Sequence, residues 1–275
     1  MVSSRTSSSS RRLTAEPLES HAEPTLRLRR VGRRFGGLDA LQDVDLDVLQ
    51  GDRRGILGPN GAGKTTLFNV ISGDMPPSSG TVELFGLDVT HMPARKRAKL
   101  GLARTYQQSR MLLGLTVEDS IYLSILGVLA GHVRPVVLPR RDGELRERAR
   151  EAARRVAIEH KLSELVGNLS HGEHRQVALA MALAVEPRVL VLDEPASGLS
   201  PGERTLLTEP LLELDRNITL LLIEHDMDVA LRVAERVTVM HEGRVIVEGT
   251  PDEIRANEIV HDLYLGRHHY AEERA

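Results

Sequence analysis

The feature that most constrains this chain is a glycine-rich segment that matches the pattern G-x-x-x-x-G-K-[ST], namely Gly58-Pro59-Asn60-Gly61-Ala62-Gly63-Lys64-Thr65-Thr66. The short apolar run 55–57 precedes it, and the helical spacing of Leu67, Val70 and Ile71 follows it. Strand, loop and helix in this order form the context in which the pattern binds phosphate. An incidental lysine in a glycine-rich turn would need neither neighbour, so we predict a nucleoside triphosphate site.

Each part of the segment has a physical role in such a site. The glycines let successive backbone N–H groups turn inward as a cradle for phosphate oxygens. The following helix adds its positive N-terminal end. Lys64 brings a positive charge to the β- and γ-phosphates, and the Thr65 hydroxyl is placed to ligate Mg²⁺. The predicted ligands are therefore a nucleoside triphosphate and Mg²⁺.

Composition excludes several other classes of protein. The chain has 275 residues, 41% hydrophobic and 27% charged, and its net charge of −3 gives no basic face for nucleic acid. The absence of cysteine excludes disulfides and thiolate metal sites. The longest apolar run, 121–130, is about half the length of a membrane-spanning helix. The N-terminus lacks the apolar region of a secretory signal, so we expect a soluble cytoplasmic protein.

The spacing of apolar residues predicts where the strands begin. Residues 1–24 are rich in Ser, Arg, Glu and Pro, which predicts a disordered tail. Between Thr25 and Val48 apolar and polar residues alternate, as is typical of antiparallel strands. Phe35 lies between these strands beside a glycine turn. Spacing alone leaves two interpretations of it open: a core side chain, or a ring that stacks on a purine.

A helical segment then interrupts the strand pattern. The segment 81–85 is typical of a strand, and the basic stretch 95–99 of the solvated face of a short helix. From about residue 108 to 169 the pattern is helical, with one long polar helix from Asp142 to about Glu159. No strand signal occurs there, so we interpret the segment as an inserted helical subdomain.

Two continuous apolar runs, Val189–Glu194 and Thr219–His225, end in polar residues. Such runs are typical of strands buried on both faces of a parallel sheet, and polar groups at their carboxyl ends indicate a doubly wound α/β fold. Asp193 is placed where a phosphate-binding enzyme needs a carboxylate for Mg²⁺ and its water shell. Glu194 is the candidate general base for an attacking water, provided that the backbone turns at the strand end.

Two further polar residues at strand ends are weaker candidates. His225 would orient the attacking water or contact the γ-phosphate, although a lone histidine is more often structural. Gln107 ends the predicted strand 102–107, and its neutral amide suits a contact with the γ-phosphate or Mg²⁺. Spacing alone assigns a function to neither residue.

The segment Leu169-Ser170-His171-Gly172-Glu173 predicts a second anion site at the start of a helix. Ser170 is a good N-cap, and apolar residues at helical spacing follow it. Gly172 leaves the helix start open for a phosphate to approach. The whole helical segment separates this site from the first one, so a partner molecule would have to complete it.

These motifs resemble, in type and in order, those of the ATP-binding cassette (ABC) ATPases. The resemblance covers about residues 25–266, and an L-S-x-G segment between a phosphate-binding loop and an acidic strand end is very specific to that family. It implies a P-loop NTPase (RecA-like) α/β core with a mixed sheet, an antiparallel β subdomain and a helical subdomain inserted at about 108–185. Residues 267–275 would form a C-terminal tail.

The resemblance also implies a role in ATP hydrolysis for the first set of candidates. Phe35 looks like the aromatic residue that stacks on adenine, and Gln107 like the Q-loop residue near Mg²⁺. Asp193 looks like the Mg²⁺ acid, and Glu194 like the catalytic base. His225 looks like the switch histidine, so the implied cofactors are ATP and Mg²⁺.

The second anion site resembles the family signature, which clamps ATP on the opposite subunit of a dimer. Ser170 and Gly172 match that signature. Glu173 stands where a glutamine is usual, and Ser200 where many relatives have an aspartate. We expect the first departure to matter little for hydrolysis, whereas the second leaves the communication between subunits open.

Within the family, the segments 104–107, 223–227, 248–254 and 264–266 resemble the ATPases of branched-chain amino acid importers. This resemblance implies a place at the cytoplasmic face of the membrane, with integral-membrane permease subunits and a second ABC ATPase, identical or paralogous, as partners. An extracytoplasmic substrate-binding protein would be an indirect partner. The alternatives are a urea or amide importer ATPase, an exporter ATPase and a soluble ABC ATPase, which would often have a second cassette or a long coiled coil.

Overall fold

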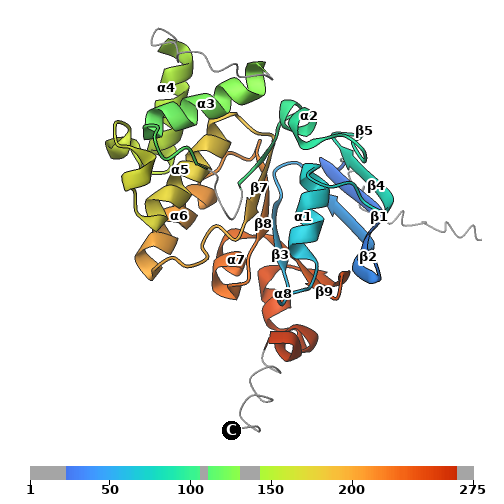
Figure 1. Ribbon diagram of the computed structural model, residues 1–275. Helices are drawn as coiled ribbons and strands as arrows, with labels where there is room; N and C mark the ends of the chain where they lie inside the picture. The colour runs from blue at the N-terminus through green and yellow to red at the C-terminus, as the bar shows by residue number, and fades with distance from the viewer. Residues whose placement is uncertain (1–22, 106–110, 131–142, 265–275) are drawn as a thin grey trace, which may run out of the picture.

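The computed structural model describes residues 23–105, 111–130 and 143–264, which form two sheets and a set of helices (Figure 1). The strands are β1 (Leu26–Phe35), β2 (Leu38–Val48), β3 (Arg53–Leu57), β4 (Ser79–Leu84), β5 (Leu87–Asp88), β6 (Leu102–Arg104), β7 (Val189–Asp193), β8 (Thr219–Ile223), β9 (Arg236–His241) and β10 (Arg244–Gly249). The α-helices are α1 (Lys64–Ser72), α2 (Ala94–Lys99), α3 (Val117–Ala130), α4 (Gly143–Arg155), α5 (His171–Ala184), α6 (Pro201–Leu212), α7 (Met227–Val233) and α8 (Pro251–Arg255). Two short 3-10 helices are η1 (Glu159–Lys161) and η2 (Val166–Asn168).

The first sheet is antiparallel and has the strand order β2-β1-β4-β5. Leu28 and Leu46 lie opposite each other on β1 and β2, and their buried face shares one hydrophobic core with Leu67 and Phe68 of α1. Polar residues alternate with the buried ones along both strands. The antiparallel strands predicted between residues 25 and 48 are therefore confirmed.

The second sheet is mixed and has the order β10-β9-β3-β8-β7-β6. The strands from β9 to β6 run parallel to their neighbours, and β10 pairs antiparallel with β9. Every residue of β3, β7 and β8 is buried. Helices cover one face of the sheet, and α1 with the antiparallel sheet covers the other. The predicted α/β core with a mixed sheet is confirmed.

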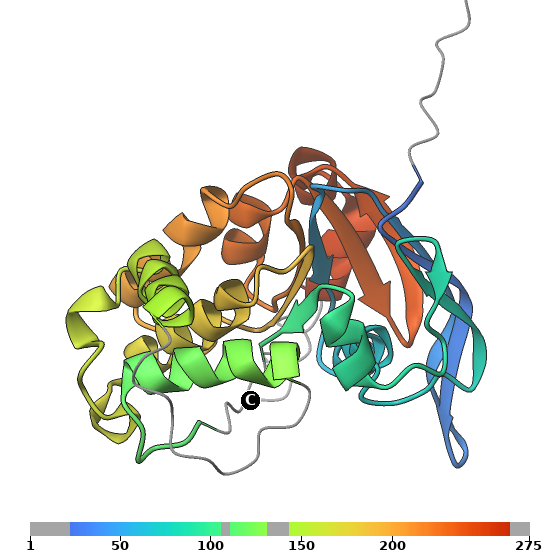
Figure 2. The ribbon, with the colours of Figure 1, turned by 90° about the horizontal axis from the view of Figure 1, so that it is seen from above.

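The helices α3, α4 and α5 pack against one another around buried residues such as Ile121, Ala153 and Val177. Both views place them on the side of the mixed sheet away from the antiparallel sheet (Figures 1 and 2). The long polar helix predicted to reach Glu159 ends earlier, because Ala157 adopts a left-handed backbone with φ 56°. Most of the two predicted tails lies outside the described residues, and the subdomain boundaries stay a prediction.

Arg97 corrects the interpretation of the basic stretch 95–99 as a solvated face. Its side chain is fully buried and donates hydrogen bonds to the backbone carbonyls of Val70 and Ile71, each at 2.7 Å. It also donates to the carbonyls of Met92 and Val89. Burial lowers the pKa of Arg97 to about 10, so the guanidinium stays charged at neutral pH. One side chain thus caps the carboxyl end of the helix that begins at the phosphate-binding loop.

We predict that Arg97→Met lowers the free energy of unfolding by about 3 kcal/mol or more, because several buried carbonyls lose their partner at once. Urea unfolding followed by circular dichroism measures the change. The matched control is Lys96→Met on the exposed side of the same helix, expected to change stability by less than about 0.5 kcal/mol. Equal effects of the two substitutions would show that the cap is unimportant.

Candidate nucleotide-binding and hydrolysis site

The loop from Gly58 to Gly63 connects β3 to α1 with a backbone that needs glycine. Gly63 has φ 98° and begins the helix, and its carbonyl accepts a 2.8 Å hydrogen bond from the Leu67 N–H. A Cβ atom at Gly63 would lie 2.5 Å from the carbonyl oxygen of Ala40 on β2. The antiparallel sheet therefore presses directly on the loop, and only glycine fits there.

Lys64 lies at the first turn of α1 with its ammonium folded onto the loop. Its Nζ donates to the carbonyls of Gly58 at 2.6 Å and Pro59 at 3.1 Å. Burial lowers the pKa of Lys64, and the charges of Glu194 and Asp193 oppose that shift. The charge is therefore held inside the loop that was predicted to bind phosphate, on the side that faces the two acids.

Asp193 and Glu194 are brought to the same edge of the sheet by a backbone turn. Asp193 ends β7 and is buried, and Glu194 adopts φ 46°, a left-handed conformation that is strained for a residue other than glycine. Adjacent strand residues normally point to opposite faces, and this turn removes that obstacle. Strain of this kind concentrates at functional sites.

His225 follows β8, the neighbouring strand, and faces the same acid. Its Nδ1 lies 3.7 Å from Oε2 of Glu194, and its side chain is half exposed. The structure thus places His225 beside Glu194, where it can contact a group bound at the sheet edge. The strand predicted over 102–107 is shorter than expected, because β6 ends at Arg104. Gln107, the remaining strand-end candidate, lies outside the described residues.

Phe35 ends β1 in the hairpin that leads to β2, and 43% of its surface is exposed. The interpretation of Phe35 as a core residue is therefore wrong. The guanidinium of Arg33 lies 4.7 Å from the ring centroid, which shows that the ring accepts a planar cationic group by stacking. The hairpin strand β2 also contacts Gly63, so the ring belongs to an element that borders the phosphate-binding loop.

The donor groups at this edge fit Mg²⁺ bound together with a nucleotide. Among the described residues, Oδ1 of Asp193 is buried without a hydrogen-bond partner, and Asp193 and Thr65 line one groove. The described part of the chain has no group of three or more side chains that could hold a metal by itself. Mg²⁺ commonly takes one or two protein ligands and fills its shell with water and phosphate oxygens. One acid and one hydroxyl suit that mode.

The signature segment begins α5 with a reciprocal cap. Ser170 Oγ accepts from the Glu173 N–H, and the Glu173 carboxylate accepts from the Ser170 N–H at 2.7 Å. Hydrogen bonds from the backbone and side chain of Ser170 lower the pKa of Glu173. A glutamine would make the same cap, which explains why Glu173 is compatible with this helix.

Ser200 caps the next helix, α6, in the same way through Glu203. The Glu203 carboxylate also reaches α5, because a Cβ atom at Gly172 would lie 2.5 Å from its Oε1. Hydrogen bonds from Ser200, and after them from the Gly172 backbone N–H, lower the pKa of Glu203. The Glu203 carboxylate of the same chain therefore lies where the sequence predicted an anion. The phosphate-binding loop takes no part in the contact between Glu203 and Gly172.

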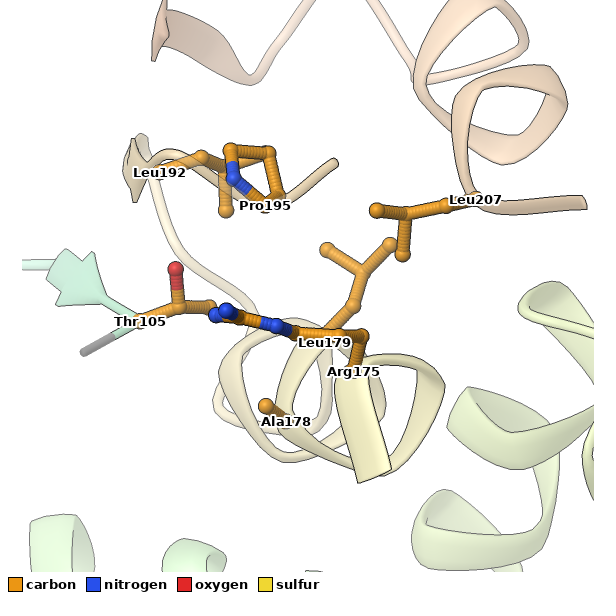
Figure 3. Close-up of a pocket in the computed structure, with 7 residues that line it drawn as sticks. All are labelled: Thr105, Arg175, Ala178, Leu179, Leu192, Pro195 and Leu207. Carbon is orange, nitrogen blue, oxygen red and sulfur yellow. The ribbon is translucent and has the colours of Figure 1, made fainter. Parts of the chain in front are cut away.

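Arg175 of α5 links this helix to the sheet edge that bears Asp193 and Glu194 in the same chain. Figure 3 shows its side chain reaching toward Thr105, with Pro195 and Leu192 on the other side of a cavity of about 10 Å³. Burial lowers the pKa of Arg175, and the charges of Glu224, Glu194 and Asp193 oppose the shift. A rotation of α5 would therefore move a positive charge relative to three acids.

Glu224 is a functional candidate that the sequence analysis missed. It follows β8 directly, is fully buried, and its Oε1 accepts a 2.9 Å hydrogen bond from the Ala196 N–H. That bond ties the strand end bearing His225 to the turn after Glu194. Burial raises the pKa of Glu224 to about 7. The sequence did contain the signal, since an acid at the end of a buried run had already identified Asp193.

The fold and the site define a P-loop ATPase, and comparison with known proteins identifies its family. The model of the family described as "ABC transporter" matches residues 41–197, and that of "Branched-chain amino acid ATP-binding cassette transporter" matches 244–270. The chain belongs to the ABC transporter family. Its activity is ATP hydrolysis coupled to transport. Among the described residues, no helix has the length and apolar character needed to cross a membrane.

Individual relatives agree with this assignment. The chain is 34% identical to "High-affinity branched-chain amino acid transport ATP-binding protein LivG" of Salmonella typhimurium over 89% of this chain and 99% of the relative. It is 33% identical to the protein BraF of Pseudomonas aeruginosa, which has the same description, over 89% and 99%. The crystal structure of the ADP conformation of MJ1267, an ATP-binding cassette of an ABC transporter, superposes with a TM-score of 0.79 at 30% identity over 88% and 99%.

We predict that Glu224→Gln changes how stability depends on pH. The folded pKa of about 7 is above the ordinary value of 4.5, so the folded state binds the proton more tightly. The wild-type protein should therefore lose stability as the pH rises through about 7, relative to the variant. The glutamine side chain keeps an oxygen that accepts the hydrogen bond from the Ala196 N–H. At pH 8 the variant should therefore have a free energy of unfolding higher than that of the wild type, by on the order of 1–3 kcal/mol.

Urea unfolding at pH 5, 6, 7 and 8 measures this difference between wild type and variant. The control is Glu258→Gln at an exposed position near the C-terminus, for which the two pH profiles should run parallel. Parallel profiles for Glu224→Gln as well would mean that the Glu224 carboxyl has an ordinary affinity for protons.

Proposed function

We propose that this chain is the ATP-hydrolysing subunit of an importer for branched-chain amino acids, at the cytoplasmic face of the membrane. The observation that supports this substrate class is the pair of matches to branched-chain amino acid cassettes: LivG along 99% of its length, and the C-terminal family model over 244–270. Tyr264 of that C-terminal segment packs against the hydrophobic cluster that contains Leu57, the last residue before the phosphate-binding loop. Burial raises the pKa of its hydroxyl, and the Gly58 backbone acts against that shift.

Within this proposal, residues 25–266 form the ATPase domain, with the tails outside it. The backbone from Gly58 to Thr66, Lys64 in particular, binds the triphosphate, and Phe35 stacks on adenine. Mg²⁺, when bound, neutralises charge on the phosphate oxygens and orients them. Thr65, Asp193 and Gln107 would hold it.

Glu194 then acts as the base toward the attacking water, since it lies at the edge of the sheet next to Lys64 and His225. A glutamate at this position takes the proton of the water as the water oxygen bonds to the γ-phosphorus. The bond from that phosphorus to the β–γ bridging oxygen breaks, and ADP and phosphate leave. His225 orients the water or the γ-phosphate from the neighbouring strand. Each group comes from the end of a different buried strand, so the reacting atoms meet at one edge.

A second ABC ATPase completes the site in this proposal. Ser170 and Gly172 lie at the start of α5. Ser170 contacts Glu173, which is paired with Lys161, and Gly172 lies against Glu203. These contacts do not include the loop around Lys64. The signature of one subunit would therefore clamp ATP held by the loop of the other. ATP bound between them would favour the closed pair, and hydrolysis would release it.

The permease subunits would dock at the groove between the core and the helices. The groove has a volume of about 940 Å³. Met111, Ser124 and Met181 line its helical side, where the permease would make contact, whereas Thr65, Arg104 and Asp193 line the core side, where Mg²⁺ would bind. Leu112 and Leu113 are about 60% exposed beside it. Exposed leucines next to an apolar groove suit a helix of a membrane protein. The substrate-binding protein would act through the permease, without contact to this chain.

We predict that Glu194→Gln lowers ATP turnover by at least about 100-fold and stabilises an ATP-bound dimer. The amide keeps the shape of the carboxylate but cannot accept a proton. A phosphate-release assay measures turnover, and light scattering after gel filtration with ATP measures the dimer. Glu209→Gln on the exposed face of α6 serves as the control. Undiminished hydrolysis by the Glu194 variant would remove Glu194 from the role of base.

The transport assignment is tested by an affinity purification of the Glu194→Gln protein with ATP from detergent-solubilised host membranes. We expect two hydrophobic permease chains and a second cassette ATPase, identified by mass spectrometry. Uptake of labelled leucine and of labelled urea in cells lacking the gene then separates the two importer classes. Recovery of ribosomes, DNA or soluble chains alone would contradict the importer assignment and leave the ATPase.

A further inference from the structure

We propose that Arg104 is a positioning residue for the metal site: it holds one oxygen of the Asp193 carboxylate and leaves the other directed at the water shell of Mg²⁺. The inference rests on the proposed assignment of Asp193 to Mg²⁺. Arg104 is the last residue of β6 and its side chain is only 5% exposed. Its guanidinium makes contacts on two sides.

The strand register explains why Arg104 can reach the acid. Arg104 is paired with Val191 in the parallel ladder between β6 and β7. Paired residues on adjacent strands share a face, and Val191 and Asp193, two residues apart, share it as well. Arg104 Nη2 accordingly donates to Oδ2 of Asp193 at 2.9 Å.

The other end of the guanidinium contacts the end of the helix that begins at the phosphate-binding loop. Arg104 Nη1 donates to Asn69 Oδ1 at 2.7 Å, Ser72 Oγ at 2.8 Å and Asp74 Oδ2 at 2.9 Å. One planar, always charged group therefore connects the acid at the end of β7 to α1. The position of Asp193 relative to Lys64, at the opposite end of α1, is set by this connection.

The two oxygens of Asp193 are used differently. Oδ2 is bound by Arg104, whereas Oδ1 is buried and has no hydrogen-bond partner among the described residues. A charge-assisted hydrogen bond fixes the plane of the carboxylate. The positive charge beside Oδ2 also repels a second cation on that side, so a metal with its waters is directed to Oδ1.

A purely structural role for Arg104 would give a different result. If Arg104 only joined β6, β7 and α1, its loss would weaken nucleotide binding equally with and without metal. If Arg104 orients a metal ligand, its loss lowers the affinity for Mg²⁺ and leaves metal-free nucleotide binding unchanged. Partners of this kind behind a metal ligand typically change metal affinity by about 10-fold to 100-fold.

The test measures binding of a fluorescent ATP analogue to the full-length chain, first in EDTA and then across a titration with Mg²⁺. For Arg104→Met we expect the half-saturating Mg²⁺ concentration to rise about 10-fold, with the affinity in EDTA changed less than about twofold. Arg104→Gln keeps one donor for Asp193 but loses the charge and the fork, so a rise of at least about threefold is expected.

Two matched controls separate position from charge. Arg216→Met removes an arginine from an exposed ion pair with Glu235, at a site distant in the chain from Asp193. Asp74→Asn neutralises one of the three far partners of Arg104. It leaves the contacts with Asn69 and Ser72, and so the connection to α1, as well as the contact with Asp193. Both should keep the half-saturating Mg²⁺ concentration within about twofold of wild type, whatever they do to thermal stability.

The possible outcomes are distinguishable. Equal losses in EDTA and in Mg²⁺, or an unchanged Mg²⁺ midpoint, would overturn the role of Arg104, and Arg104→Gln decides the question where Arg104→Met does not fold. Asp193→Asn tests the assignment beneath it. If that variant keeps the wild-type Mg²⁺ midpoint, the metal assignment of Asp193 fails first, and the proposal for Arg104 fails with it.

Discussion

The alignment of three parallel strand ends is the constraint on which the site depends. Ile223 of β8 is aligned with Ile56 of β3 on one side and with Asp193 of β7 on the other. The next residues of the three strands therefore emerge at one level. The hydrogen bonds continue past the strands, from the Glu194 N–H to the Ile223 carbonyl at 3.0 Å. A slip of one residue would send these side chains to the opposite face of the sheet.

Charge balance at this edge follows from the same alignment. Asp193, Glu194 and Glu224 lie close together, and like charges in a buried place would repel unless cations face them. The cations come from separate elements: Lys64 from α1 and Arg175 from α5, with Arg104 from β6 against Asp193. The three elements α1, α5 and β6 thus contribute one positive charge each, so packing and electrostatics specify the same arrangement. Glu224, the most buried of the acids, has the raised pKa.

Sequence reasoning succeeded where the physical signal is local. The loop from Gly58 to Thr66 and the buried runs of β7 and β8 are contiguous patterns, so their placement in an α/β core followed directly. Arg97 and Arg104 were not assigned because their partners lie far away in the chain, at Val70 and at Asp193. A basic residue in a polar stretch looks solvated until the fold shows which carbonyls or acids surround it. The domain boundaries and the roles of the site residues stay predictions.

Helix capping accounts for both departures from the family pattern. Glu173 and Ser200 differ from the usual glutamine and aspartate, yet each belongs to a reciprocal cap, at the start of α5 and of α6. Glutamate and glutamine serve equally as the third residue of such a cap, and serine and aspartate serve equally as its first. Glu173 and Ser200 thus keep the reciprocal helix caps that the usual glutamine and aspartate would form.

The two caps also meet each other. Glu203, which completes the cap of α6, lies so close to Gly172 of α5 that a side chain there would collide with its carboxylate. The glycine is therefore required by contacts within one chain, before any ligand is considered. The Gly172 N–H that would donate to a phosphate oxygen donates to this carboxylate, because a helix start favours any anion within reach. The N–H groups at the start of α5 therefore favour an anion by their geometry alone, and either the Glu203 carboxylate or a phosphate can be that anion.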